Sequence, residues 1–200
     1  MSSDQLALGI RERPTASPLE REARRLARPV LRAVLSGKIR TNGLDAARRE
    51  GRDREHGIIE CLARVLSSAP EYRRLSSADL GIEKDGVILA GNVAFKIGKR
   101  AELEANLYAS SPNKRDILAE AVTVAPCIVA MERAIPLVDA RHDICSGYHD
   151  DEELKCRMNS FTCDAHDGNI GLTPDGRYVL IDYSFDADIQ RNRSSSSDSP

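Results

Sequence analysis

The stretch of sequence that decides the fold is Cys163-Asp164-Ala165-His166-Asp167-Gly168-Asn169-Ile170-Gly171, followed by Val179-Leu180-Ile181-Asp182-Tyr183. Two short apolar runs, 170–172 and 178–181, have the composition of β-strands, and Thr173-Pro174-Asp175-Gly176 between them is typical of a tight turn. The pattern predicts a hairpin in which Asn169 opens the first strand and Asp182 closes the second. Because the open ends of a hairpin meet, we expect Asn169 and Asp182 to be neighbours, with Asp164 on the loop that leads in.

These three side chains carry the oxygen atoms that phosphoryl transfer from ATP requires. The reaction needs Mg²⁺ across the phosphates and a carboxylate beside the attacking hydroxyl. Mg²⁺ prefers hard oxygen ligands, usually one or two protein groups together with phosphate and water. The amide oxygen of Asn169 and the carboxylate of Asp182 suit the metal, and Asp164 suits the hydroxyl. The spacing therefore predicts an ATP–magnesium site.

The same residues resemble a known family. Asp164, Asn169 five residues later and Asp182 thirteen residues after that resemble the catalytic loop and metal-binding segment of protein kinases. His166, two residues after the first Asp, looks more like the aminoglycoside and choline phosphotransferase branch; small phage-encoded and bacterial kinase-like proteins also look similar. The resemblance implies that Asp164 is the catalytic base and that His166 steadies the transferred group. It also implies that Asn169 and Asp182 bind Mg²⁺.

Two upstream stretches agree with this resemblance, which covers about residues 78 to 186. Val93-Ala94-Phe95-Lys96 is similar to the kinase strand whose Lys contacts the α- and β-phosphates of ATP. Glu104 is the candidate for pairing with Lys96, and Glu102 competes with it. The stretch 128–134 is similar to the strand that enters the kinase hinge, where backbone groups near Glu132 and Ala134 would hydrogen-bond adenine.

The resemblance implies an α+β chain with a reduced protein-kinase-like two-lobe fold and an N-terminal helical extension. The expected parts are a disordered tail, an N-terminal helical region, a β-rich part like an N-lobe, a reduced C-lobe with the catalytic loop, and a second disordered tail; they span 1–16, 17–77, 78–134, 135–190 and 191–200.

Periodicity and turn residues predict the individual elements. One helix begins at a capping box of Ser17, Pro18 and Glu20 and bends at Pro29; the next is interrupted near Gly51 and Gly57. The remaining helices are expected at 99–109 and 151–158. Strands outside the hairpin are expected at 80–82, 87–89, 93–97, 121–124 and 127–131.

The sequence departs from the kinase pattern in four places. Gly81 and Gly86 replace a full Gly-x-Gly-x-x-Gly before Lys96, so we expect only a reduced loop over the phosphates. Thr162 stands two residues before Asp164 where kinases have His, and Tyr183-Ser184 follows Asp182 in place of Phe-Gly. Only 18 residues follow Asp182, so we expect the activation segment and the late helices to be missing.

The composition of the chain limits which partners and which cellular location are expected. The formal net charge of −2 argues against nucleic acid as a partner, and no apolar run approaches the roughly 18 residues that span a membrane. Five Cys at irregular spacings and the lack of a secretory leader favour a cytoplasmic location. Export into a host cell by a route without a cleaved signal stays open.

Three other interpretations remain. A structural zinc site would draw on six potential ligands, which are His142, Cys145, His149, Cys156, Cys163 and His166. A kinase-like chain this short could bind nucleotide or a partner without catalysis, and the same metal pair could support adenylyl transfer. For the phosphoacceptor, a protein hydroxyl is favoured over a small molecule, because a reduced second lobe offers little to enclose a small substrate.

Overall fold

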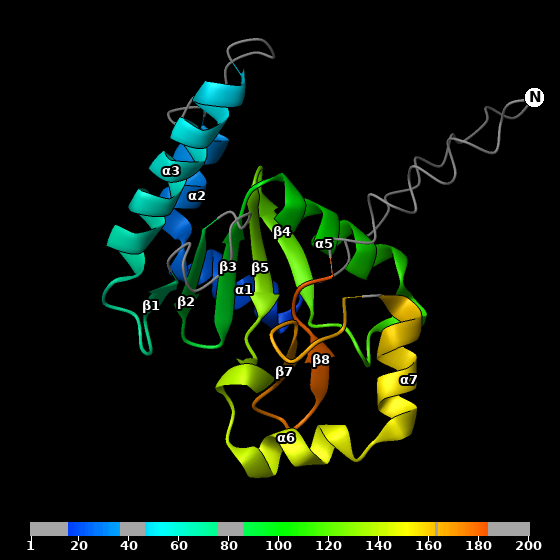
Figure 1. Ribbon diagram of the computed structural model, residues 1–200. Coiled ribbons are helices and arrows are strands. Elements are labelled where there is room, and N and C mark those ends of the chain that lie inside the picture. The colour runs from blue at the N-terminus through cyan, green and yellow to red at the C-terminus, as the bar shows by residue number, and fades with distance from the viewer. Residues whose placement is uncertain (1–15, 37–46, 76–85, 163, 184–200) are drawn as a thin grey trace, which may run out of the picture.

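The computed structural model describes residues 16–36, 47–75, 86–162 and 164–183. It is a mixed α+β structure in which helices surround one five-stranded and one three-stranded antiparallel sheet (Figure 1). Within these ranges no helix is both long and apolar enough to cross a membrane.

Two short helices begin the described chain. Helix α1 (Pro18–Leu26) starts as its capping residues predict, because the Ser17 hydroxyl accepts a hydrogen bond from the Glu20 amide at 3.1 Å. The expected bend at Pro29 is a full break at Ala27, after which α2 (Arg28–Leu35) begins. Proline fits the first turn of a new helix, where its missing N–H has no partner to lose.

Helix α3 (Ala47–Leu66) is continuous, so the interruptions expected at Gly51 and Gly57 are wrong. Each glycine inside a helix costs about 1 kcal/mol. Burial of one large aliphatic side chain stabilises by about 1.5–3 kcal/mol, and both Ile58 and Leu62 of this helix are fully buried. The packing of α3 therefore outweighs its local preference.

The larger sheet has the strand order β1-β2-β3-β5-β4. Its strands are β1 (Arg73–Leu75), β2 (Val87–Ala90), β3 (Val93–Ile97), β4 (Ala121–Ala125) and β5 (Ile128–Glu132). Four of these match the sequence prediction, but β1 lies inside the segment expected to be helical. Its edge sequence Arg73-Arg74-Leu75 has no apolar alternation that would reveal it. The strand expected at 80–82 lies outside the described residues.

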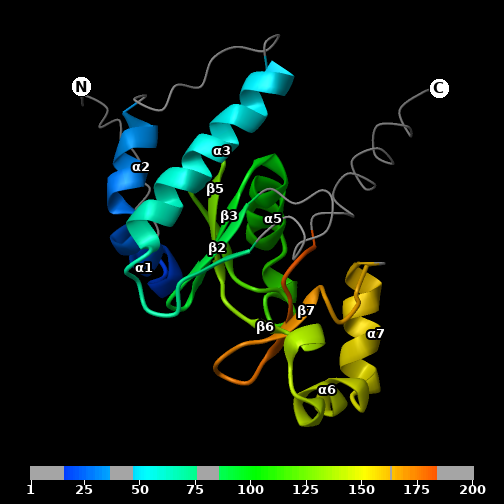
Figure 2. The same cartoon turned by 60° about the vertical axis from the view of Figure 1, so that its left-hand side comes forward.

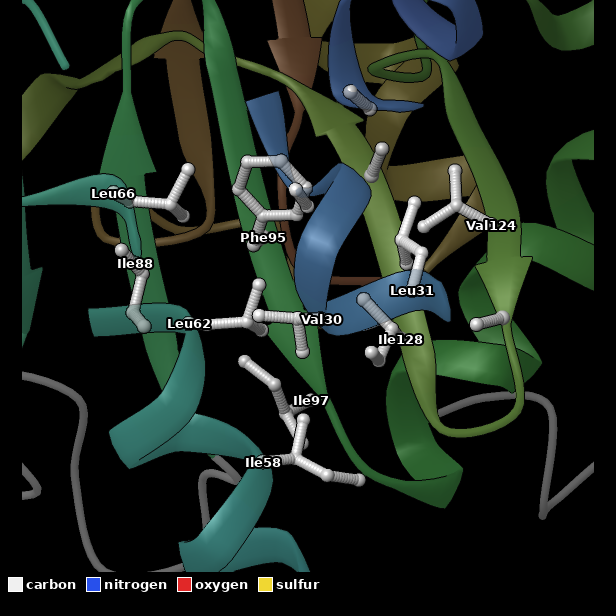
Figure 3. Packing of buried hydrophobic residues seen from close by; sticks show 14 of the residues in the cluster. Val30, Leu31, Ile58, Leu62, Leu66, Ile88, Phe95, Ile97, Val124 and Ile128 are labelled. Atoms are coloured by element: carbon white, nitrogen blue, oxygen red, sulfur yellow. The ribbon is translucent and has the colours of Figure 1, made fainter. Parts of the chain in front are cut away.

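One face of this sheet is covered by the three N-terminal helices (Figure 2). Phe95 and Ile97 of β3 point to this face and pack against Val30, Ile58 and Leu62 (Figure 3). The helices dock through Val30, Ile58 and Leu62, with Leu26 and Val65 partly buried against the cluster.

The opposite face of the sheet packs on α5 (Lys99–Ser110) and on a second hydrophobic cluster. That cluster includes the smaller sheet, formed by β6 (Ile135–Pro136), β7 (Ile170–Leu172) and β8 (Tyr178–Leu180), together with α6 (His142–His149) and α7 (Glu152–Phe161). Helix α7 was expected at 151–158, whereas α6 was not predicted. Because side chains alternate along β3, Lys96 belongs to this second face.

Candidate functional site

Asp164 and Asn169, the first two residues of the predicted site, are joined directly. The side-chain amide nitrogen of Asn169 donates to Oδ2 of Asp164 at 2.8 Å and to its backbone oxygen at 3.1 Å. Asn169 is only 3% exposed, so its orientation is fixed by these bonds. No donor among the described residues reaches its amide oxygen. That oxygen can therefore serve a further ligand.

The loop is folded around its own backbone. The Asp164 amide donates to the hydroxyl of buried Thr162 at 3.1 Å, and the His166 amide donates to the Asp164 carbonyl at 3.0 Å. The Asn169 amide then donates to the His166 carbonyl at 2.7 Å. Thr162, which the sequence marks only as a departure from the kinase pattern, caps the loop and so acts on the position of Asp164.

His166 lies beside the Asp164 carboxylate and faces solvent. Its Nε2 is 3.6 Å from Oδ1 of Asp164, and 62% of its side chain is exposed. Its Nδ1 accepts a hydrogen bond from the Gly168 amide at 3.1 Å. A Cβ at position 168 would come within 2.9 Å of the ring, so a larger residue there would displace the exposed His166 side chain.

The hairpin brings Asn169 and Asp182 to the same end, as the sequence predicts. Strands β7 and β8 pair with Ile170 opposite Leu180, and the Ile181 amide donates to the Asn169 carbonyl at 2.8 Å. Asp182 follows this last bond directly. The three predicted residues Asp164, Asn169 and Asp182 thus occupy one continuous hydrogen-bonded patch, although 18 residues separate the first from the last.

Lys96 of β3 reaches this patch from the larger sheet. Its Nζ lies 2.9 Å and 2.7 Å from the two carboxylate oxygens of Glu104 and donates to the Ile181 carbonyl at 2.6 Å. The competing Glu102 has another role, because its Oε1 accepts a hydrogen bond from the Cys127 amide at 2.7 Å. The structure therefore selects Glu104 as the partner of Lys96.

Glu104 is buried beside a second carboxylate. It is 2% exposed, and burial raises its pKa to about 7; the Lys96 ammonium opposes this shift. Asp182 raises the pKa further, through its negative charge and through a side-chain hydrogen bond. Two carboxyl groups and one ammonium therefore meet here, and the two carboxyl groups together hold a proton more tightly than an isolated carboxyl group does.

The predicted adenine contacts lie at the end of β5. The Glu132 amide donates to the Glu120 carbonyl at 2.7 Å, but the Glu120 amide turns to Oε2 of Glu132 at 3.3 Å. Oε1 of Glu132 accepts from Arg177 at 2.6 Å, a contact that the sequence did not suggest. Across the described part of the chain, neither the Glu132 carbonyl nor the Ala134 amide has a hydrogen-bond partner. These two groups are available to a ligand.

Two of the residues considered for zinc have other partners, and a third, Cys156, is a free and exposed thiol. The Cys145 thiol donates to the Leu137 carbonyl at 3.1 Å, and Nε2 of His149 lies 3.4 Å from Oδ2 of Asp167. No group of three or more His, Cys, Asp or Glu side chains able to hold a metal occurs in the described ranges. Cys163 lies outside the described residues, as does Gly81 of the expected phosphate loop.

Comparison with known proteins adds no assignment. No family model matches the chain, and no curated protein matches it either.

Proposed function

We propose that this protein is an ATP- and magnesium-dependent phosphotransferase with a reduced kinase-like two-lobe fold. The observation that carries the proposal is the double contact of Lys96, which binds Glu104 and also the carbonyl of Ile181, the residue before Asp182. The contact with Ile181 spans 85 residues of sequence. It supports the proposal because a cation for phosphate and a carboxylate for metal must lie side by side in such a site.

The donor set fits Mg²⁺. Asn169 offers an amide oxygen and Asp182 a carboxylate, which are hard ligands from two residues, and phosphate and water would complete an octahedron. The bound ion would neutralise charge on the phosphates. In this proposal Lys96 binds the α- and β-phosphates, and the free groups at Glu132 and Ala134 bind adenine.

The proposed base is Asp164. Its Oδ2 is held by Asn169, while Oδ1 faces His166 and the solvent side of the loop. A carboxylate in this arrangement can accept the proton of an incoming hydroxyl as the hydroxyl attacks the γ-phosphorus, and the bond to ADP then breaks. The exposed ring of His166 lies where it can donate a hydrogen bond to the transferred group.

The proposed acceptor is a protein hydroxyl. The part of the described chain beyond Ala134 contains only three short strands and two short helices besides a single 3-10 turn. Such a small second lobe offers little surface to enclose a free small molecule. An exposed Ser or Thr on another protein needs less enclosure, although a small-molecule acceptor remains the alternative.

A nucleotide-binding module without turnover is the second candidate. The observation that favours it is the hydrogen bond from Asn169 to Oδ2 of Asp164. This bond engages one of the two carboxylate oxygens that the proposed base would use to accept a proton. Both candidates require the metal and nucleotide site, so they differ only in transfer.

Thermal unfolding with ATP, in the presence and absence of Mg²⁺, tests the site that both candidates share. A ligand that binds only the folded state stabilises it by about 2.7 kcal/mol at a hundredfold excess over its Kd. We expect Mg²⁺ to enlarge the shift in Tm that ATP causes, and Asp182→Ala to abolish this enlargement. Asp150→Ala, at an exposed position after α6, is the matched control. The absence of any ATP-dependent shift in the wild-type protein at millimolar ATP would refute the proposal.

A further inference from the structure

Tyr183, the residue after Asp182, is anchored to a distant part of the chain. Its side chain is fully buried, and its hydroxyl donates a hydrogen bond to the Ala119 carbonyl at 3.0 Å, across 64 residues of sequence. Its ring meets the ring of Phe161 edge-on, with 6.3 Å between the centroids. Both ends of this side chain are therefore held.

The acceptor belongs to a segment that is itself fixed to the hairpin. Residues 117–119 run parallel to the end of β8, because the Leu180 amide donates to the Ile117 carbonyl at 2.8 Å and the Ala119 amide donates to the Leu180 carbonyl at 3.0 Å. Ala119 therefore uses its amide for Leu180 and its carbonyl for Tyr183. The segment 117–119 therefore hydrogen-bonds to the chain on both sides of Asp182, at Leu180 and at Tyr183.

Asp182 consequently lies between two anchored neighbours. On one side, Ile181 donates its amide to Asn169 and accepts from Lys96 through its carbonyl. On the other side, Tyr183 is held by the bond of its hydroxyl to Ala119. Both neighbours of Asp182 are therefore held, and the Tyr183 side is held by groups that the proposed site does not use.

Packing explains why an aromatic ring lies at position 183, but it does not explain why that ring carries a hydroxyl. A phenylalanine would fill the same volume and make the same contact with Phe161. The phenolic hydroxyl adds direction, because a buried hydroxyl must keep its acceptor and a single rotation of the ring about Cα–Cβ satisfies the Ala119 carbonyl. A ring without the hydroxyl could shift along its hydrophobic surroundings and carry the Asp182 backbone with it.

We propose that Tyr183 is a positioning residue for Asp182, and that the bond from its hydroxyl to the Ala119 carbonyl holds the Asp182 carboxylate in the orientation that binds Mg²⁺. The inference rests on the proposed function, since it assigns a metal to Asp182. Outer groups that orient a metal ligand typically change metal affinity by about 10- to 100-fold when they are removed.

Tyr183→Phe tests the proposal, because it deletes only the hydroxyl. The measurement is calorimetric titration of Mg²⁺ into protein saturated with a non-hydrolysable ATP analogue, together with the affinity for the same analogue without metal. We expect Mg²⁺ affinity to fall about tenfold, while the metal-free affinity for the analogue stays unchanged. A purely structural role would lower Tm but would not separate these two affinities.

Tyr148→Phe is the matched control, because Tyr148 is a buried tyrosine of the same cluster that packs on Tyr178 and His149. This variant should leave Mg²⁺ affinity unchanged. Equal Mg²⁺ affinity in Tyr183→Phe and the wild type would overturn the inference while leaving the proposed function standing. No Mg²⁺ binding in the wild-type complex would instead refute the metal site and the inference with it.

A second variant covers the case in which Tyr183→Phe does not fold. Replacement of Tyr183 alone by 3-fluorotyrosine keeps the ring and the hydroxyl but makes the hydroxyl a stronger donor. We expect its Mg²⁺ affinity to differ from that of the wild type by a factor that the same replacement at Tyr148 does not produce. An identical response at both positions would contradict the inference.

Discussion

Lys96 and Glu104 form an ion pair in which the lysine Nζ lies 2.9 Å from one carboxylate oxygen and 2.7 Å from the other. The Ile181 carbonyl, 2.6 Å from the same nitrogen, takes a third hydrogen bond. An ammonium has three protons, so all of its donors are directed without a nucleotide present. A phosphate that binds Lys96 must therefore replace or share one of these acceptors, and the neutral Ile181 carbonyl is the weakest of the three.

The first prediction concerns this lysine. Lys96→Ala should remove most of the stabilisation by ATP and Mg²⁺, because the Lys96 ammonium is held beside the Asp182 segment by the Ile181 carbonyl. The variant should still fold, since Glu104 already has a raised pKa and can take up a proton when its partner is lost. Differential scanning fluorimetry measures both effects. Lys99→Ala, at the exposed start of α5, should keep the full ATP-dependent shift, and an equal loss in both variants would contradict the assignment.

The second prediction concerns pH. Glu104 has a folded-state pKa of about 7 against an ordinary value of 4.5, so the folded protein binds an extra proton between these values. Its contribution to stability is therefore full below about pH 4.5 and is lost as the pH rises towards 7, by something on the order of 3 kcal/mol. Glu104→Gln cannot titrate and should flatten this part of the profile.

Urea denaturation at a series of pH values from 4.5 to 8 measures this difference. The informative quantity is the free energy of unfolding of the wild type minus that of Glu104→Gln, which should become less favourable to the wild type as the pH rises. Glu152→Gln, at an exposed position on α7, is the control and should leave the profile unchanged. A difference that does not vary with pH would show that Glu104 is ionised throughout.

The third prediction concerns the choice of base. The Glu132 carbonyl accepts and the Ala134 amide donates, and adenine offers the complementary amino group and ring nitrogen. Guanine presents the opposite order, so each contact would face a like group. We expect ATP to bind at least about tenfold more tightly than GTP, which corresponds to roughly 1.4 kcal/mol. Competition of each nucleotide against a fluorescent ATP analogue measures this ratio, and equal affinities would place the base elsewhere.

Much of the fold follows from local sequence. The hairpin was predictable because its turn residues and its two apolar runs agree, and the strands of β2 to β5 carry clear apolar runs. Strand β1 was not predicted, because Arg73 and Arg74 are exposed at a sheet edge and show no apolar pattern. The extended conformation of this segment depends on its pairing with β2. The continuity of α3 through Gly57 likewise depends on packing against the sheet, which no local preference contains.

The residues of the candidate site could be proposed from the sequence, but the hydrogen bonds and ion pairs between them could not. Spacing indicated Asp164, Asn169 and Asp182, yet it could not decide between Glu102 and Glu104. One helical turn offers both carboxylates, and only the tertiary structure shows that Glu102 binds the turn at Cys127. The anchoring of Tyr183 on Ala119 is a contact between distant segments, for which a single sequence carries no signal.

The fourth prediction concerns His166. Because 62% of its side chain is exposed and its ring contacts Asp164 and Gly168 of its own loop, His166→Ala should change Tm little. It should slow turnover while nucleotide affinity stays near that of the wild type, since the ring lies beside the Asp164 carboxylate rather than at Asn169 or Asp182. Steady-state transfer rates and nucleotide titrations separate the two effects. His149→Ala, on α6, is the control, and an unchanged rate in His166→Ala would remove His166 from the catalytic group.

Asp164 is the proposed base in phosphoryl transfer. The structure determines how to test it, because Asp164→Ala would also deprive Asn169 of its side-chain acceptor and leave only the backbone oxygen. Asp164→Asn keeps an oxygen for Asn169 but cannot take up a proton. It should therefore preserve the binding of ATP and Mg²⁺ while abolishing the base.

The most direct measurement is the transfer of label from γ-labelled ATP to protein in a cell lysate, with the wild type and Asp164→Asn compared at equal nucleotide occupancy. The account predicts a labelled protein band with the wild type and a rate at least about a hundredfold lower with Asp164→Asn, the usual scale for loss of acid–base help. Full transfer by Asp164→Asn would contradict the account. So would the absence of any transfer by a wild-type protein that still binds ATP and Mg²⁺.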